Sequence, residues 1–335
     1  MHKGRWAVGA IAVLVAGVVV TAAVAASAKD KTYYFIPKDT LNPYEVIADH
    51  GGKLALTELG DKQVVSSGTE DTAAAQQPAI QAAIQAHAAG IVIAGNDPQA
   101  VCPALQQAQA QGTKVVAFDS DVNCRSLFIN QADTETIGRS QVKLLAQMMG
   151  YKGEFAILSA ASTATNQNAW IKYMKLELKK PAYKNMKLVK FYYGNDNPAQ
   201  SRQATVSMLQ AYPNLKGIES PTTVGISSAA QYLSTSKYKG KIVLTGLGLP
   251  SQMKKYVHNG TVKQFALWNP EDLGYLAGYA VSALAEGTIT GKVGETFKAG
   301  KLGTYKIIVG PDKKPQVILG PPYVFNAKNV DKFKF

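Results

Sequence analysis

Short apolar runs alternate with longer helical segments along most of the chain, and this alternation restricts the fold more than any other feature. In the first part we expect strands at residues 32–38, 63–67, 90–94 and 114–120. Between them, residues 72–89 carry apolar side chains at spacings of three and four, which predicts a helix. Asp97 and Pro98 are expected to open the next helix, which Gly112 ends. Such strand–helix units are typical of a parallel sheet with helices on both faces.

The same pattern restarts in the second half of the chain. The expected strands are 155–159, 188–193, 217–220 and 242–246, and the expected helices are 165–180, 198–212, 225–236 and 250–259. Further apolar segments lie at 127–130, 265–269, 307–309, 317–319 and 324–325. Two such blocks predict an α/β protein with two doubly wound parallel-sheet lobes joined by hinge strands.

The late apolar segments suggest that each lobe is built from two pieces of the chain. We expect residues 29–128 plus about 270–318 to form the N-terminal lobe. Residues 129–269 plus about 319–335 would form the C-terminal lobe. Because ligands of parallel sheets bind beyond the carboxyl ends of the strands, the binding site is expected in the cleft between the lobes.

Residues 1–28 have the organisation of a secretory signal peptide. Lys3 and Arg5 precede an uncharged run over residues 6–26, and Ala26-Ser27-Ala28 stands directly before a polar segment. We therefore expect cleavage after Ala28 and export to the periplasm, and no cysteine lies at this point to carry a lipid anchor. A membrane anchor is the alternative, because about 20 apolar residues can span a bilayer.

Charge and cysteine content exclude several classes of protein. The net charge is +13, but the lysines are scattered in ones and twos, so a solvated basic surface is expected and nucleic-acid binding is not. Cys102 and Cys124 are the only cysteines and are a disulfide candidate in an oxidising compartment. Two cysteines cannot form a zinc site, and the four histidines lack metal-ligand spacing. We expect no metal and no cofactor.

Polar and aromatic residues follow the carboxyl ends of successive expected strands. They are Lys38, Asn42, Asp119, Asp121, Asn166, Gln167, Trp170, Pro221, Thr223 and Asn269. Carboxylates, amides and aromatic faces are suited to a small polyhydroxylated ligand. Each position has an alternative: Asn166 and Asn269 also suit helix capping, and Trp170 also suits packing. Asp119 and Asp121 also suit a turn.

Enzymatic motifs are weak in this sequence. There is no Gly-x-Ser-x-Gly segment and no phosphate-binding loop, and Gly246-Leu247-Gly248 lacks the third glycine of a dinucleotide fingerprint because Ser251 stands there. An exported carbohydrate-active enzyme is a remote alternative. It would need carboxylates on two sides of the scissile bond, whereas Asp119 and Asp121 come from the same strand end. We therefore expect binding without turnover.

Several short stretches carry a family resemblance. They are 35–38, 101–105, 118–121, 124–126, 129–131, 166–170, 260–263 and 267–269. With these, the chain resembles periplasmic solute-binding proteins of ABC sugar importers, of the ribose-binding type, and most of all the autoinducer-2 and rhamnose receptors. The resemblance implies a periplasmic binding protein type I fold and a monomer that delivers its ligand to an inner-membrane permease. A receptor for chemotaxis or sensing that uses the same cleft is the alternative.

The resemblance also implies roles for individual residues. Lys38, Asp119, Gln167 and Pro221 match the ligand-binding residues of autoinducer-2 receptors. Those receptors have an aspartate where this chain has Asn166, and an alanine at position 223, where this chain has threonine. These departures put autoinducer-2 in doubt, and the segments 42–44 and 268–274 are more similar to the rhamnose-like receptors. The expected ligand is autoinducer-2, rhamnose or a related sugar.

Overall fold

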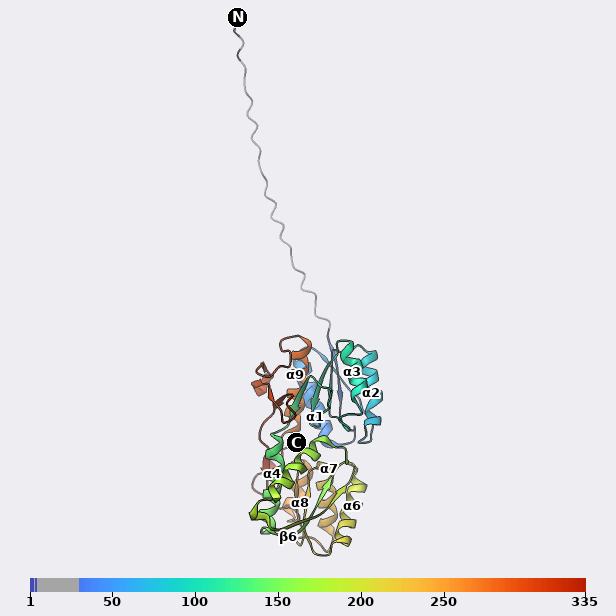
Figure 1. Cartoon of the computed structure of the whole chain (residues 1–335), viewed down its shortest axis with the longest axis vertical. Coiled ribbons are helices and arrows are strands. Elements are labelled where there is room, and N and C mark those ends of the chain that lie inside the picture. Colours follow the sequence, from blue (N-terminus) through green and yellow to red (C-terminus); the bar gives the residue numbers. More distant parts are fainter. Residues whose placement is uncertain (3, 5–29) are drawn as a thin grey trace.

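The computed structural model describes residues 1, 2, 4 and 30–335. The expected signal peptide therefore lies almost wholly outside the described residues. Residues 30–335 form two α/β lobes, one above the other (Figure 1). Within this part of the chain, no helix has both the length and the apolar composition needed to cross a bilayer.

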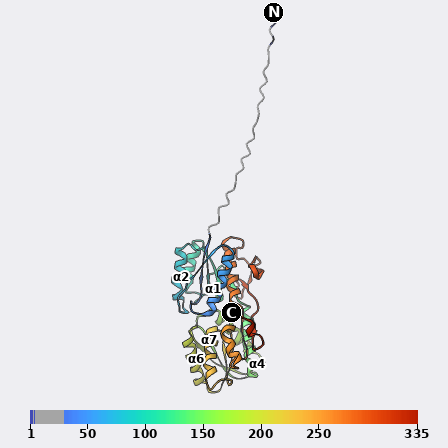
Figure 2. The same cartoon turned by 180° about the vertical axis from the view of Figure 1, so that it is seen from behind.

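The first lobe is built on a seven-stranded sheet in the order β13-β14-β5-β4-β3-β1-β2, parallel except for β13. Its strands are β1 (Thr32–Ile36), β2 (Lys62–Val65), β3 (Gly90–Ile93), β4 (Lys114–Phe118), β5 (Leu127–Asn130), β13 (Ile308–Val309) and β14 (Pro315–Ile318). Its helices are α1 (Pro43–Glu58), α2 (Ala73–Gln85), α3 (Cys102–Ala110) and α9 (Pro270–Ala285). The pair α1 and α9 packs on one face and the pair α2 and α3 on the other (Figures 1 and 2).

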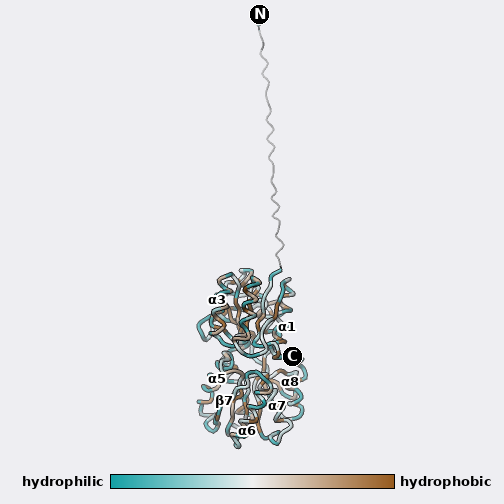
Figure 3. Tube along the Cα trace, turned by 90° about the vertical axis from the view of Figure 1, so that its right-hand side faces the viewer, coloured by the Kyte–Doolittle hydropathy of each residue, from teal (hydrophilic) through white to brown (hydrophobic). Residues whose placement is uncertain are grey.

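The second lobe is built on a four-stranded parallel sheet in the order β7-β6-β8-β9. Its strands are β6 (Lys152–Ser159), β7 (Asn185–Tyr193), β8 (Leu215–Ser220) and β9 (Val243–Gly246). Its helices are α4 (Thr134–Met149), α5 (Thr165–Leu178), α6 (Pro198–Ala211), α7 (Thr223–Thr235) and α8 (Pro250–His258). Helix α4 packs against α5, and α6 packs against α7. Hydrophobic stretches lie inside each lobe (Figure 3).

Shorter elements complete the molecule. An antiparallel ribbon of β10 (Phe265–Leu267) and β15 (Tyr323–Phe325) lies beside β9 through a bridge between Leu247 and Ala266. A hairpin joins β11 (Thr296–Lys298) and β12 (Thr304–Lys306). Single helical turns span η1 (Pro181–Tyr183), η2 (Gly300–Leu302) and η3 (Val330–Lys332). The chain crosses between the lobes after β5, β10 and β14, so a strand leads into each crossing.

The predicted α/β class with two sheets of parallel strands is confirmed, whereas some local predictions were wrong. Asp97 accepts hydrogen bonds from the backbone N–H groups of Gln99 and Ala100, which forms a turn, and α3 begins only at Cys102. Helix α4 and the β11–β12 hairpin were not predicted at all. Strand β5 pairs with β4 through Ile129, one residue beyond the lobe boundary expected at 128.

Candidate functional site

A buried lysine–aspartate pair lies at the carboxyl ends of β1 and β4. Lys38 Nζ is 3.5 Å from Asp119 Oδ2, and the two side chains are 4% and 5% exposed. Asp119 follows β4 directly and has a left-handed backbone with φ of 54°, a conformation that aspartate adopts more readily than most residues. The sharp change of direction at this residue ends the strand.

Asp119 is the centre of a hydrogen-bond network that joins the two lobes. Its Oδ1 accepts a bond of 2.9 Å from the hydroxyl of Tyr44, in the first lobe. Its Oδ2 accepts a bond of 3.0 Å from Nδ2 of Asn166, which belongs to α5 of the second lobe. The carboxylate of Asp119 therefore bridges the cleft.

The surrounding charges keep Lys38 protonated. Burial alone would lower the pKa of Lys38, but the carboxylates of Asp119, Asp71 and Asp196 outweigh this effect and raise the pKa above its ordinary value. Lys38 is thus a permanent cation in the cleft. A cation and a carboxylate held together in this way form charge-assisted hydrogen bonds with hydroxyl groups.

The second lobe contributes neutral amides. Gln167 Oε1 accepts bonds from Ser159 Oγ at 2.6 Å and from the Ala160 N–H at 2.7 Å, which fixes the side chain against the end of β6. Its Nε2 has no hydrogen-bond partner within residues 30–335. Ala164 occupies the N-cap position of α5 without a capping side chain, and Asn166 Oδ1 accepts a bond of 2.7 Å from the Gln167 N–H in the first turn.

Three aromatic side chains form a wall of the same cleft. Trp268 Nε1 donates a bond of 2.7 Å to the Tyr44 hydroxyl, and the two rings meet edge-on with centroids 6.3 Å apart. The ring of Trp170 lies 5.8 Å from that of Trp268. Asn42 caps α1, Pro43 begins it, and Tyr44 lies in its first turn.

Together these side chains enclose a small cavity. Eight of the predicted site residues line it: Lys38, Asn42, Asp119, Asn166, Gln167, Trp170, Pro221 and Thr223. The cavity volume is about 30 Å³, which is room for a water molecule or two. Ligand pockets usually measure several hundred Å³, so the lobes must separate to admit a sugar-sized molecule.

The structure places the other two predicted residues elsewhere. Asp121 forms a paired contact with Arg125 at 2.8 and 2.9 Å and lines a neighbouring cavity of about 190 Å³. Asn269 caps α9, where its Oδ1 accepts from the Glu271 N–H at 3.0 Å. The capping alternative therefore describes Asn269.

Two acidic residues of the cavity were missed in the sequence. Glu45 is 1% exposed, and its Oε2 has no partner among the described residues. Burial raises the pKa of Glu45 well above its ordinary value. Asp196 follows β7 and accepts a bond from the Thr222 hydroxyl; burial first, and then Asp71, raise its pKa to about 7. The strand-end rule would have found Asp196, whereas Glu45 lies within a helix and carries no such signal.

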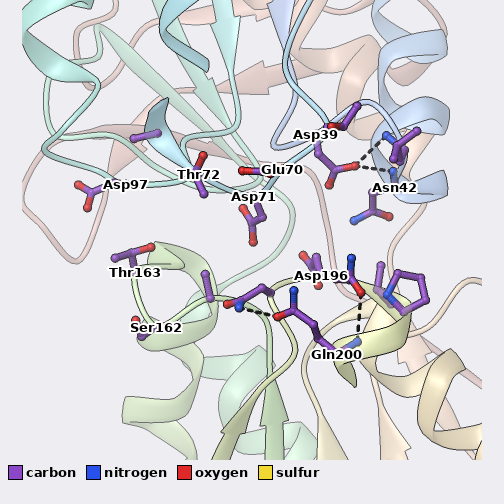
Figure 4. Close-up of a pocket in the computed structure, with 18 of the residues that line it drawn as sticks. Asp39, Asn42, Glu70, Asp71, Thr72, Asp97, Ser162, Thr163, Asp196 and Gln200 are labelled. Atoms are coloured by element: carbon purple, nitrogen blue, oxygen red, sulfur yellow. Dashed lines mark hydrogen bonds between the residues drawn. The ribbon is translucent and has the colours of Figure 1, made fainter. Parts of the chain in front are cut away.

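A larger, acidic pocket of about 740 Å³, which we call the mouth, shares Asn42 and Asp196 with the small cavity (Figure 4). The first lobe lines it with Asp39, Glu70, Asp71 and Asp97, and the second lobe with Asp196, Asn195 and Gln200. No lysine or arginine of residues 30–335 is among the side chains that line this mouth. Its charge disfavours the entry of anionic molecules such as sugar phosphates.

Cys102 and Cys124 form a disulfide with a Cα–Cα distance of 5.5 Å. The bond ties the start of α3 to the loop between β4 and β5, away from the cavity. In the described part of the chain, no group of three or more His, Cys, Asp or Glu side chains is suited to hold a metal ion.

Residues 33–289 match the model of a protein family described as periplasmic binding protein domain. An ABC transporter solute-binding protein from Clostridium phytofermentas, solved with bound L-rhamnose, is 39% identical to the chain with a TM-score of 0.89, over 91% of this chain and 98% of the other. A sugar ABC transporter structure from Actinomyces odontolyticus is 47% identical over the same shares, with a TM-score of 0.71.

LsrB from Clostridium saccharobutylicum in complex with AI-2 is 24% identical, with a TM-score of 0.83 over 91% of this chain and all of the other. This likeness concerns the fold alone. The match over residues 33–289 and the two-lobed architecture show that the chain belongs to the periplasmic binding protein domain family, with a type I fold, and that it is a solute-binding protein and not an enzyme.

Proposed function

We propose that the chain is an exported receptor that captures a small neutral sugar in the cleft and delivers it to an ABC permease of the inner membrane. The observation that carries this proposal is the network in which Asp119 contacts Lys38 and Tyr44 of one lobe and Asn166 of the other. Groups with paired donors and acceptors, buried beside aromatic rings, are suited to sugar hydroxyls and to the C–H face of the ring.

Ligand capture would use the same side chains that join the two lobes through Asp119. A sugar hydroxyl that binds Asp119 replaces the amide of Asn166, and the second lobe then closes on the sugar through Asn166 and Gln167. The crossings after β5, β10 and β14 absorb the rotation, as in hinge closure generally. One wall of the cleft would come from residues 29–128 plus about 270–318, and the other from residues 129–269 plus about 319–335.

Among sugars, we propose a rhamnose-like ligand ahead of autoinducer-2. The relative solved with L-rhamnose is 39% identical over nearly the whole described chain. Asn166 and Thr223 also depart from the autoinducer-2 pattern on the second-lobe wall of the cavity. Because residue 166 is an amide, Asp119 is the carboxylate that remains to accept hydrogen bonds from the ligand. Compared with the alanine of autoinducer-2 receptors, Thr223 adds a methyl group and a hydroxyl.

Thermal-shift measurements and calorimetry with L-rhamnose, D-ribose, D-arabinose and autoinducer-2 test the proposal. We expect L-rhamnose to raise the melting temperature and to bind with one site per chain. Stabilisation by none of these compounds would overturn the sugar-receptor function. Stabilisation by autoinducer-2 alone would overturn only the choice of ligand.

The substitution Asn166→Asp tests the role of this position in selectivity. It places a second carboxylate about 3 Å from Asp119, where the two carboxyl groups would share a proton. We expect the ratio of the affinities for autoinducer-2 and L-rhamnose to rise at least about tenfold. An unchanged ratio would show that residue 166 does not select the ligand.

Export is tested by the N-terminal sequence of the protein recovered from the producing cell. We expect the mature chain to begin at Lys29, after cleavage behind Ala28. A chain that keeps residues 6–26 and sediments with membranes would support the anchored alternative. Gel filtration of the mature chain tests the expected monomer.

A further inference from the structure

The positive charge of the molecule is concentrated in one lobe. Residues 131–269 contain eighteen lysine and arginine residues and six acidic residues. Residues 30–130 and 270–318 contain twelve basic and sixteen acidic residues. A charge that served solubility alone would be spread over both lobes, so the basic second lobe requires another explanation.

The topology gathers many of these lysines at one end of the second lobe. Seven of them lie within the first three residues of a parallel strand or within the six residues before it, and we call this set the basic pole: Lys152, Lys184, Lys187, Lys216, Lys237, Lys239 and Lys241. All seven are exposed. In sequence they span 90 residues and appear scattered, but parallel strands bring their starts to a single edge.

Strand pairing confirms how close these positions are. Lys152 on β6 lies opposite Asn185 on β7, the residue after Lys184. A Cβ atom at Gly153 would lie 2.9 Å from Cγ of Lys216, so this lysine covers the start of β6. On the other side, Val243 of β9 pairs with Gly217, which brings Lys241 beside the start of β8.

The basic pole has few acidic neighbours. Of the six acidic residues in 131–269, Glu177 and Glu219 are buried and Asp196 faces the cleft. Glu154 pairs with Lys187 at 3.0 Å, and the other six pole lysines form no ion pair within residues 30–335. The pole is therefore a net positive surface in which only Lys187 is paired with an acidic residue among residues 30–335.

The basic pole faces away from the ligand cleft. The cleft residues follow the carboxyl ends of the same strands, and the eight residues of β6 separate the two ends by roughly 25 Å. Strand β6 is labelled at the lower end of the molecule, remote from the first lobe (Figure 1). A partner at the pole would not compete with ligand entry.

We propose that the basic pole binds the anionic headgroups of a phospholipid bilayer. The strand starts lie side by side in the order β7-β6-β8-β9, so the lysines are spread across the whole edge of the sheet, which suits a membrane surface better than a groove-bound polymer. Tyr151 lies next to Lys152 at this end and is 39% exposed, and tyrosine is enriched where proteins meet the headgroup region. Lysines close to an anionic bilayer attract it additively, and salt screens that attraction.

Vesicle sedimentation tests the proposal with residues 30–335, which contain every strand and helix of both sheets. We expect binding to vesicles of equal parts phosphatidylglycerol and phosphatidylcholine, and little binding to phosphatidylcholine alone. Replacement of Lys152, Lys184, Lys216 and Lys239 by Gln should weaken binding at least about tenfold. High salt should weaken binding of the unmodified protein to a similar degree.

A matched variant separates the pole from net charge. Replacement of Lys53, Lys292, Lys298 and Lys306, four exposed lysines of the first lobe, removes the same charge and should leave vesicle binding within about twofold of the unmodified protein. Three outcomes would each overturn the proposal. They are an equal loss of vesicle binding in both variants, equal binding of the unmodified protein to neutral vesicles, and retention on polyglutamate without binding to vesicles. Ligand-induced stabilisation in the pole variant shows that it is folded and tests the proposed receptor function separately.

Discussion

The two lobes place their charged side chains in opposite ways. The first lobe directs charged groups into the cleft, where Lys38, Glu45 and Asp119 are all buried. The second lobe lines most of its side of the cavity with the neutral residues Asn166, Gln167, Pro221 and Thr223, and carries its lysines on the outside. This difference suggests a division of work in which the first lobe holds the ligand and the second lobe covers it.

The largest expected effect comes from Asp119→Ala in the first lobe. This substitution leaves Lys38 buried without its nearest carboxylate, so we expect the free energy of unfolding to fall by about 3–5 kcal/mol. Ligand affinity should fall at least about a hundredfold, because a charge-assisted bond is lost. Urea denaturation and calorimetry measure the two effects.

The matched substitution in the second lobe is Gln167→Ala. It removes a neutral amide, so its effect on affinity should be about tenfold and its effect on stability about 1 kcal/mol. The double variant Lys38→Met with Asp119→Asn removes both charges and keeps a residue that tolerates the left-handed backbone, so it should recover stability but not binding. Equal losses for Asp119→Ala and Gln167→Ala would contradict the proposed division of work.

The next effect in size concerns the disulfide, which stabilises the first lobe. Replacement of both Cys102 and Cys124 by Ser releases a loop of 22 residues and should lower the free energy of unfolding by about 3 kcal/mol. Neither residue lines the cavity, so a ligand should still raise the melting temperature. Loss of the ligand response in a folded double variant would show that the loop after β4 depends on the bond to position Asp119.

The third effect is a pH dependence that arises in the second lobe. Glu219 on β8 is fully buried, neither carboxyl oxygen has a partner among the described residues, and burial raises its pKa well above the ordinary value. The unfolded chain releases this proton near pH 4.5, whereas the folded chain keeps it to a higher pH. The contribution of Glu219 to the free energy of unfolding is therefore complete below about pH 4.5 and is lost as the pH rises through the raised pKa. Glu219→Gln should remove this loss.

The comparison is made by urea denaturation at pH 5 and pH 8. We expect Glu219→Gln to match the unmodified protein at pH 5 and to exceed it by about 1–3 kcal/mol at pH 8. Asp49→Asn is the control in the first lobe, where burial raises the pKa of Asp49 to about 7. The contribution of Asp49 to the free energy of unfolding is therefore lost between about pH 4 and pH 7. A parallel pH profile for the unmodified protein and Glu219→Gln would show that Glu219 is hydrated.

The smallest effect is expected on the surface of the second lobe. Lys187 and Glu154 form an ion pair in which the lysine side chain is 71% exposed, so Lys187→Gln should change the free energy of unfolding by less than about 0.5 kcal/mol. The first-lobe counterpart is Arg125→Gln, which breaks paired contacts of a side chain that is 1% exposed and should cost about 3 kcal/mol. Similar values for both would remove the contrast between outer and inner charges.

The sequence predicted the parallel strands of both sheets and the strand ends at which the small cavity lies, because apolar periodicity and strand ends are local features. It could not decide which side chains at that edge face the cleft. Asp119 and Asp121 are two residues apart, yet Asp119 faces the second lobe while Arg125 holds Asp121 on another side. Glu45 escaped notice because only the packing of α1 against the cavity sets it apart from an ordinary helical glutamate.

The basic pole gives the complementary case. Each of its lysines is an ordinary surface residue in the sequence, and the cluster exists only because four strands start at the same edge. Charge patterns of this kind depend on topology, so a scan along the chain cannot detect them.

The left-handed backbone at Asp119 has a consequence for the evolution of the receptor. Only glycine, asparagine and a few other residues adopt this conformation at low cost, so few mutations at this position keep the loop intact. Positions 166 and 223 on the opposite wall belong to α5 and α7, so a new side chain there meets no left-handed backbone. A substitution at 119 therefore changes the loop and the ligand contact together, whereas one at 166 or 223 changes the ligand contact without that strain.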